Sequence, residues 1–373
     1  PALMMSGGLD SASIVAMALR RETTTGDDSV HTYSMVGVES GAGSESTAIH
    51  SLSHLKGIVP HLFSIDLEGN ELGLRDLQEV AWTRAHPIDN SILLPALIFL
   101  AASRDGCRVM LHGANGDVTL WTSTRYLAAA LRVGRVRYAL NESRAARRHH
   151  VAWYGKPTAK ILAMNAYEAF VPQRVRTSVS AWRYARRRPR QSLLRPDFAE
   201  RIRNSREARA DIDLVTSGSW GDDPESIAEM IMYGMSGFGR VASRYGMEVA
   251  DPWADRRVVE FFLGLPTDLK VREGWTKYPV RMAFAEDLPA EVLQRRDKEH
   301  LGWRLVQRLM GASRDMVADR VRNDLDILQP YVNPSTVQSL FEEYSRTASA
   351  ALGLQLYELV SLLTWLERVD SHA

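Results

Sequence analysis

The sequence predicts an α/β protein built on a parallel, doubly wound sheet, with a largely helical C-terminal half. Up to about residue 120, apolar runs of strand length alternate with segments of helical length, and this alternation is typical of parallel sheets. From Trp121 onward strand signals fade and helical patterns dominate. We therefore expect residues 1–120 to form an α/β core and residues 121–373 to form a mainly helical remainder of the same domain.

The individual elements follow from turn and cap signals. Strands are expected at residues 2–5, 30–38, 61–65 and 108–112. Helices are expected around residues 14–19, from about 46 to 56, at 72–85 and at 92–103, with Gly57 and Pro87 ending two of them. In the second half, we expect helices at 127–146, at 256–265 and, as one long buried helix, at 224–245. The stretch from Glu248 to Asp255 interrupts the helices as an extended or turn segment around Pro252.

The composition is that of a soluble globular protein, with 45% apolar and 24% charged residues and a net charge of +1. The single cysteine, Cys107, excludes an internal disulfide and any zinc site that needs two cysteines, and it fits a reducing compartment. We expect no signal peptide, and the longest apolar run, residues 92–102, is too short to span a bilayer. We expect a cytoplasmic protein with no membrane partner.

One segment is strongly basic. Residues 174–209 contain twelve arginines and three acidic residues. Such a segment could face nucleic acid or an acidic peptide, but a solvated helical surface paired with acids elsewhere is the favoured interpretation.

The first apolar run leads directly into a small polar loop, residues 6–11, here called the first loop. Its glycines, Gly7 and Gly8, allow close approach of the backbone to a ligand, and the following helix offers N–H groups and the positive end of its dipole. Ser6 and Ser11 add hydroxyl donors, and Asp10 can hold a divalent cation between phosphate oxygens. The alternative is an ordinary strand-to-helix turn, since Gly, Ser and Asp favour turns.

A second glycine-containing loop, residues 113–117, follows the fourth expected strand and is here called the second loop. Ligands of doubly wound sheets lie beyond the carboxyl ends of the strands. Both loops are therefore expected at the same edge of the sheet.

Five short motifs follow one another along the chain. They are Ser6-Gly-Gly-Leu-Asp-Ser11, Gly113-Ala-Asn-Gly-Asp117, Glu248-x-x-x-Pro-Trp-x-Asp255, Lys277-x-x-x-Arg281 followed by Leu288-Pro289, and Arg295-x-x-Lys298. In this order they resemble the motifs of the asparagine synthetase family, whose synthetase domain is of the ATP pyrophosphatase, or PP-loop, type. The resemblance extends from Leu3 to about Gly302. It implies an adenine nucleotide alpha hydrolase-like fold.

The resemblance also implies the reaction and the site. MgATP converts a carboxylate to an acyl-adenylate with release of pyrophosphate, and an amine then displaces AMP. Adenylation requires positive charge around the departing pyrophosphate. Asp10 and Asp117 would share Mg²⁺, and Lys277 and Lys298 would be the catalytic lysines. The implied nucleotide-binding residues are Met4, Ser6, Gly7, Gly8, Asp10, Ser11, Met35, Val36 and Gly113, with Met35 and Val36 next to adenine.

Three departures from the family pattern bear on the substrate. The chain has Ala114 where the family has Glu, Ala250 where it has Arg, and Gly239 where Asp is usual. These changes argue against ammonia-dependent asparagine formation. The segments around residues 253–260, 274–277 and 296–303 look most like family members that close lasso-peptide macrolactams. In those enzymes the acid is a side chain of a precursor peptide and the amine is its N-terminus.

The expected partners follow from these two readings. The carboxylate substrate is aspartate or a precursor peptide, and a glutaminase domain or a leader-processing protein could act with this chain. The family's N-terminal glutaminase domain is not found in the sequence given, which opens on Pro1 only a few residues before the first loop. We therefore expect that the chain is truncated on its N-terminal side or is one half of a split protein.

Two other functions are weighed. A tRNA-modifying PP-loop enzyme would use the basic segment to bind phosphates. Its aromatic residues, Trp182, Tyr184 and Phe198, are not regularly interleaved with the arginines as is typical of base stacking, so nucleic acid is not the expected partner. A non-catalytic nucleotide-binding domain would not need to retain Asp10, Asp117, Lys277 and Lys298 together.

Overall fold

The structure is a computed structural model that describes most of the 373 residues. The described residues are 2–25, 29–37, 45–66, 72–83, 86, 92–123, 125–150, 152–176, 178–179, 193–205, 224–295 and 301–372.

The sheet is parallel throughout its five described strands, which confirms the predicted α/β class. The strand order is β3-β2-β1-β4-β5. The strands are β1 (Ala2–Met4), β2 (Val30–Val36), β3 (Ile58–Ser64), β4 (Val109–Leu111) and β5 (Glu248–Ala250). The first four match the expected strands to within a few residues. The fifth strand, β5, comes from the segment that was expected only to be extended. It pairs with β4, with Ala250 opposite Leu111.

The strand order places a topological switch point at the centre of the sheet. The chain runs outward from β1 to β2 and β3, returns to β4 on the other side of β1, and later adds β5. Ala2 of β1 pairs with His31 of β2 and with Met110 of β4. Because connections leave β1 and β4 in opposite directions, their carboxyl ends open a crevice, which is where ligands bind in such sheets.

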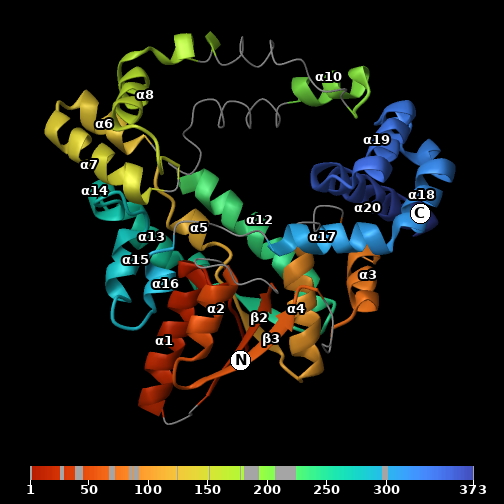
Figure 1. The fold of residues 1–373 in the computed structure, drawn as a ribbon, viewed down its shortest axis with the longest axis horizontal. Helices are drawn as coiled ribbons and strands as arrows, with labels where there is room; N and C mark the ends of the chain where they lie inside the picture. Colours follow the sequence, from red (N-terminus) through yellow and green to blue (C-terminus); the bar gives the residue numbers. More distant parts are fainter. Residues whose placement is uncertain are drawn as a thin grey trace.

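Helices cover both faces of the sheet (Figure 1). Those of the first half are α1 (Leu9–Thr25), α2 (Glu45–Ser53), α3 (Leu74–Trp82), α4 (Leu93–Arg104), α5 (Gly116–Thr119), α6 (Tyr126–Arg132), α7 (Val136–His149) and α8 (Thr158–Phe170). Those that follow are α10 (Pro196–Asn204), α12 (Pro224–Ser243), η2 (Pro252–Ala254), α13 (Arg256–Gly264), α14 (Thr267–Lys270), α15 (Tyr278–Ala283), α16 (Ala290–Leu293), α17 (Leu301–Ala312), α18 (Arg314–Asn323), η3 (Leu325–Leu328), α19 (Pro334–Thr347) and α20 (Ala350–His372). No described helix is long and apolar enough to cross a membrane.

Two apolar cores result from the alternation of side chains along the strands. Ala2 and Tyr33 belong to a core shared with α3, α4, α17 and α20, whereas Leu3 and Met5 belong to a core shared with α1, α2, α13 and α15. A third, smaller core, which includes Leu127, Ala139 and Ile161, joins α6, α7 and α8 into a helical lobe. In Figure 1 this lobe and the α18–α20 helices lie on opposite sides of the molecule, with α12 between them.

Two helix predictions are wrong in detail. The helix expected at 127–146 is divided into α6 and α7, because Gly134 has a φ of 74° and turns the chain. The helix expected to be buried at 224–245 is present as α12, but Met232 and Tyr233 are 70% and 60% exposed. Its apolar residues are therefore not all core residues.

Candidate active site

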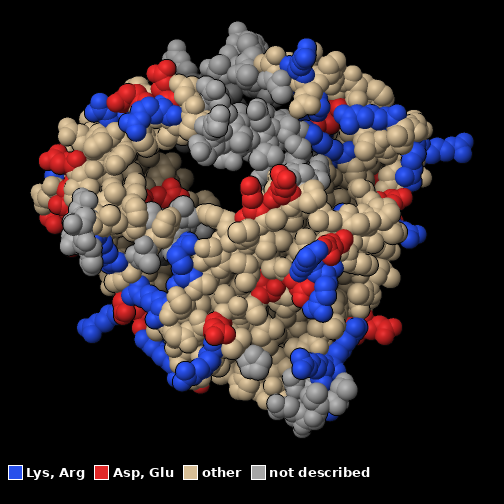
Figure 2. Space-filling view, turned by 180° about the vertical axis from the view of Figure 1, so that it is seen from behind, with Lys and Arg blue, Asp and Glu red and all other residues tan. Residues whose placement is uncertain are grey.

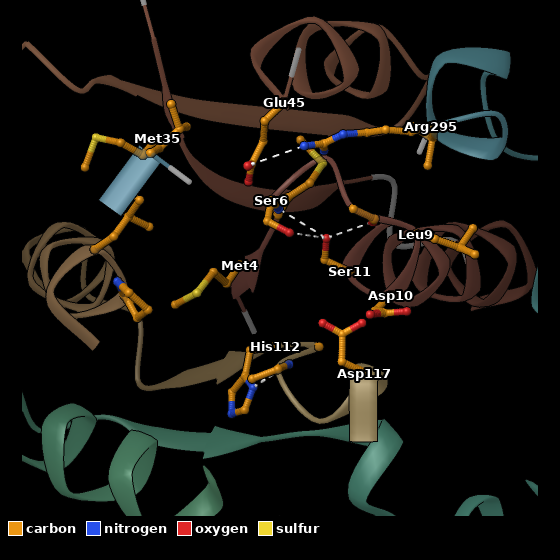
Figure 3. Close-up of a pocket in the computed structure, with 18 of the residues that line it drawn as sticks. Met4, Ser6, Leu9, Asp10, Ser11, Met35, Glu45, His112, Asp117 and Arg295 are labelled. Carbon is orange, nitrogen blue, oxygen red and sulfur yellow. Dashed lines mark hydrogen bonds and ion pairs between the residues drawn. The ribbon is translucent and has the colours of Figure 1, made fainter. Parts of the chain in front are cut away.

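A cavity of about 460 Å³ lies at the carboxyl edge of β1, β2 and β4 (Figure 3). This volume suits a small organic ligand. One part is apolar and is lined by Met4, Met35, Leu94, Pro95, Ile98, Phe238 and Leu301. The other part is polar and is lined by Ser6, Asp10, Ser11, Glu45, Asp117, Lys277, Arg281 and Arg295. Of the residues expected to bind the nucleotide, Gly7 and Val36 do not line this cavity, and the others do.

The first loop is held in a tight conformation by its serines. The Ser6 N–H donates to Ser11 Oγ at 3.1 Å, and Ser11 Oγ donates to the Gly8 carbonyl at 3.2 Å. Gly7 has a φ of 66°, and a Cβ there would lie 2.8 Å from the Glu45 carbonyl oxygen. Glycine is therefore required because the loop packs directly on the start of α2. The loop ends at the N-terminus of α1, which favours an anion.

At its two glycines, the second loop packs against the start of α1 too closely to leave room for a side chain. A Cβ on Gly113 would lie 3.0 Å from the backbone of Asp10, and one on Gly116 would lie 2.5 Å from Cγ of Asp10. Gly116 belongs to the second-loop motif but was given no role of its own. Its Gly-x-x-Gly spacing with Gly113 could have indicated close backbone packing. Close packing of the two loops sets the position of Asp10.

Lys277 joins the two loops through their carboxylates. Its Nζ lies 2.6 and 2.5 Å from the two carboxylate oxygens of Asp10, and 2.7 Å from Oδ1 of Asp117. Burial acts to lower the pKa of Lys277, but the two carboxylates outweigh it and the pKa is raised, so the ammonium stays charged. Lys277 has a φ of 56°, an uncommon backbone conformation for a residue other than glycine.

The two carboxylates offer oxygen donors for a magnesium ion, which would have to share or take the position that the Lys277 ammonium occupies in the structure. Carboxylate oxygens are the donors that Mg²⁺ prefers, and Mg²⁺ is usually bound by one or two carboxylates together with substrate phosphates. Among the described residues, no group of three or more His, Cys, Asp or Glu side chains could hold a metal ion. A cation shared by Asp10 and Asp117 would therefore need oxygen donors from a phosphate group.

Two arginines of the cavity were named in the motifs but given no role by the sequence analysis. Arg295 lies beside the first loop, is 9% exposed and pairs with Glu45 at 3.5 Å (Figure 3). Its Nε has no hydrogen-bond partner in the described structure. Arg281 donates to the carbonyl oxygens of Thr276 and Leu293, and burial lowers its pKa to about 10. Both therefore bring buried positive charge to the cavity. Lys298 lies outside the described residues.

A buried network beneath the second loop supports the site from β5. The Asp251 carboxylate accepts hydrogen bonds from the N–H of Asn115 at 2.8 Å and of Trp253 at 2.9 Å. Trp253 Nε1 in turn donates to the Asp10 carbonyl at 3.0 Å. Burial raises the pKa of Asp251 and lowers that of the neighbouring His112 to about 4. Asp255 caps α13 and accepts hydrogen bonds from the backbone N–H and the guanidinium of Arg257.

The switch point of the parallel sheet carries a glycine- and serine-rich loop and a lysine between two aspartates. These features define an α/β protein with a site for an anionic ligand. Comparison with protein families makes the assignment specific. The chain belongs to the asparagine synthase family, whose profile matches residues 1–367. No curated protein matched the chain. The family consists of ATP-dependent, amide-forming synthetases, which generally use Mg²⁺.

Proposed function

We propose that this protein adenylates a side-chain carboxylate with MgATP and transfers the acyl group to an amine, releasing pyrophosphate and then AMP. The observation that carries the proposal is the convergence of the first loop, Asp10, Asp117 and Lys277 at one edge of the sheet. A carboxylate oxygen of the acid attacks the α-phosphorus of ATP, and the bond to pyrophosphate breaks. The amine nitrogen then attacks the acyl carbon, AMP leaves, and the amine loses a proton.

Each part of the cavity has a role in this scheme. The apolar part, around Met35 and Ile98, would accept adenine and exclude water. The first loop and the α1 N-terminus would orient the pyrophosphate. Asp10 and Asp117 would hold Mg²⁺, which supplies charge neutralisation at the phosphates when bound. Lys277, and Lys298 from the sequence, would stabilise the negative charge that develops on the leaving pyrophosphate.

Within this reaction class, we propose an acidic side chain of a precursor peptide as the acid and the peptide N-terminus as the amine. The support is the set of departures from the asparagine-forming pattern. Ala114 lines the cavity at the position of the family's glutamate, so it brings no carboxylate to an ammonia site. Gly239 on α12 and Ala250 on β5 likewise lack the charged groups of that pattern.

ATP–pyrophosphate exchange tests both levels of the proposal. The purified chain is incubated with ATP, Mg²⁺ and labelled pyrophosphate, together with free aspartate or with a peptide that carries an internal Asp or Glu. Exchange that depends on the peptide supports the cyclase assignment, whereas exchange with free aspartate alone contradicts it. If no acid supports exchange, adenylation itself is refuted.

The tRNA-modifying alternative receives little support from the described surface. In the basic segment, Arg176 pairs with Glu168 and Arg195 with Asp197, while residues 180–192 and 206–209 lie outside the described part. On the face shown in Figure 2, described basic and acidic side chains are interspersed. Binding of tRNA would have to appear at low salt and weaken steeply as salt rises. Failure to bind at low salt would dismiss this alternative.

A further inference from the structure

The segment that delivers Lys277 to the site is a strained turn. Arg272 and Trp275 are joined by two backbone hydrogen bonds of 3.1 and 2.9 Å, which close a two-residue hairpin. Its central residues, Glu273 and Gly274, have φ values of 53° and 75°. Such turns favour Asn or Gly at both positions, so glutamate is unusual at the first. Lys277 also has a positive φ, and with Glu273 it makes up two of the three non-glycine residues of this kind in the described chain.

One face of α7 holds this turn. The Glu142 carboxylate accepts from the N–H of Glu273 at 2.7 Å and from the N–H of Gly274 at 3.0 Å. A Cβ on Gly274 would lie 2.5 Å from the carbonyl carbon of Ala145, so the turn rests directly on the helix backbone. The His149 ring stacks on Trp275 at 4.4 Å. Residues 142, 145 and 149 share a helix face because they are three and four positions apart.

The contacts continue from the turn to the active site. The Arg281 guanidinium lies 4.5 Å from the centre of the Trp275 ring, and its Nε donates to the Thr276 carbonyl at 2.9 Å. Lys277 follows directly and ends between Asp10 and Asp117. The position of the Lys277 ammonium is therefore tied, through residues 273–276, to a helix of the α6–α8 lobe.

Glu142 has a simpler explanation as a core residue of that lobe, but its contacts argue against it. Glu142 is only 7% exposed. Within the lobe, its carboxylate accepts a long hydrogen bond of 3.5 Å from the Tyr126 hydroxyl. Its two short hydrogen bonds both go to the turn. Two adjacent N–H groups of a left-handed turn form an anion-binding concavity, and here an internal carboxylate fills it.

We propose that Glu142 is a positioning residue for Lys277, acting by fixing the turn at residues 272–275 from α7. The inference rests on the proposed function only in giving Lys277 a role in adenylation. It predicts that a residue of the helical lobe, outside the cavity lining, controls the chemical step without controlling nucleotide binding.

The principal test is Glu142→Gln, which keeps the shape of the side chain and replaces one acceptor oxygen by an NH₂ group facing a backbone N–H. We expect the maximal rate of ATP–pyrophosphate exchange to fall about tenfold to a hundredfold, as displacement of a catalytic group by about 1 Å does. The KM for ATP should stay within about twofold, since hydrogen bonds of its own serines hold the first loop in place. Glu168→Gln, on α8 of the same lobe, removes a carboxylate that pairs with Arg125 and Arg176 and should leave exchange unchanged.

A double-mutant cycle separates positioning from general destabilisation. In a Lys277→Met background, adding Glu142→Gln should produce no further loss of exchange, because the group that it positions is already absent. An equal further loss would overturn the proposal, as would wild-type exchange in the single variant. If Glu142→Gln does not fold, His149→Ala and His149→Phe replace it. The alanine variant should lose exchange, and the phenylalanine variant, which keeps a ring over Trp275, should retain it.

A readout that needs no catalysis keeps this inference distinct from the proposed function. Lysine acylation followed by mass spectrometry should modify Lys277 more slowly than the exposed Lys160 in the wild-type protein. Glu142→Gln should accelerate modification of Lys277 alone. If the wild-type protein shows no exchange but this acceleration is seen, the proposed function fails and the positioning role stands. If the wild-type protein shows normal exchange and Glu142→Gln does not change the reactivity of Lys277, the positioning role fails.

Discussion

Replacing Gly116 by alanine tests whether close packing of the two loops sets the position of Asp10. The new Cβ would lie 2.5 Å from Cγ, 2.6 Å from Cβ and 2.9 Å from Oδ2 of Asp10. Carbon atoms in contact lie about 3.5–4.0 Å apart, so the Asp10 side chain must move by about 1 Å. Its distances to Lys277 Nζ, now 2.6 and 2.5 Å, would then exceed those of a charge-assisted hydrogen bond.

The magnitude follows from the interaction that is lost. Asp10 and Lys277 side chains are each 16% exposed, and a hydrogen bond to a charged group at such a site contributes about 1.5–3 kcal/mol. Alanine recovers up to about 1 kcal/mol over glycine within a helix. We therefore expect the free energy of unfolding to fall by about 0.5–2 kcal/mol. Exchange should fall by about tenfold or more, if the same interaction stabilises the transition state.

The assays are urea unfolding and ATP–pyrophosphate exchange, with Gly311→Ala as the matched control. A Cβ on Gly311, within α17, meets no atom within 4 Å, so the same chemical change there should leave exchange intact and raise stability by up to about 1 kcal/mol. If Gly116→Ala behaves like Gly311→Ala in both assays, the second loop does not position Asp10.

Three further changes have defined outcomes. Arg295→Ala should weaken pyrophosphate binding about tenfold or more by removing a charged donor, whereas Glu45→Gln should strengthen it by releasing Arg295; equilibrium dialysis measures both, and equal losses would contradict the role. Burial lowers the pKa of His150 to about 4 from an ordinary 6.5, so as pH falls through this window the unfolded chain binds a proton that the folded chain does not. The wild-type protein should therefore lose about 3 kcal/mol of stability from this residue between pH 7 and pH 4, and His150→Phe should remove that part of the loss in urea titrations; an unchanged pH dependence would refute it. Lys298→Ala should abolish exchange while ATP still binds, and full exchange would deny Lys298 a catalytic role.

Most of the sheet was predictable because its strands are marked by local sequence. Val30–Val36 is an apolar-rich strand followed by a loop, and its neighbours alternate with helices of ordinary length. The strand Glu248–Ala250 was not predictable as part of the sheet, since three residues carry no periodic signal and its pairing with β4 is purely tertiary. The break between α6 and α7 had a local signal in Gly134, which a helical pattern on both sides concealed.

The identity of the site residues was predictable where a short motif contains them. The contacts between residues that are far apart in the sequence were not predictable. Asp10, Asp117 and Lys277 were all selected from the sequence, and the structure brings them together. Their direct ion pair could not be foreseen, because Lys277 is 267 positions from Asp10. The role of Glu45 at Arg295 had no local signal either, since a carboxylate at a helix start is ordinary.

The pairing of β4 with a strand 139 residues later has a consequence for how the chain is made. During synthesis β1 emerges first, yet its second edge stays open until β4 arrives, and the edge of β4 stays open until Glu248–Ala250 is available. Open strand edges are templates for association with other chains, and closing long loops slows folding. Asp251 and Trp253, which brace both loops, arrive at the same late moment. A fragment that ends near residue 120 should therefore aggregate, and recovery of its fold should require the later segment in the same chain or supplied in trans.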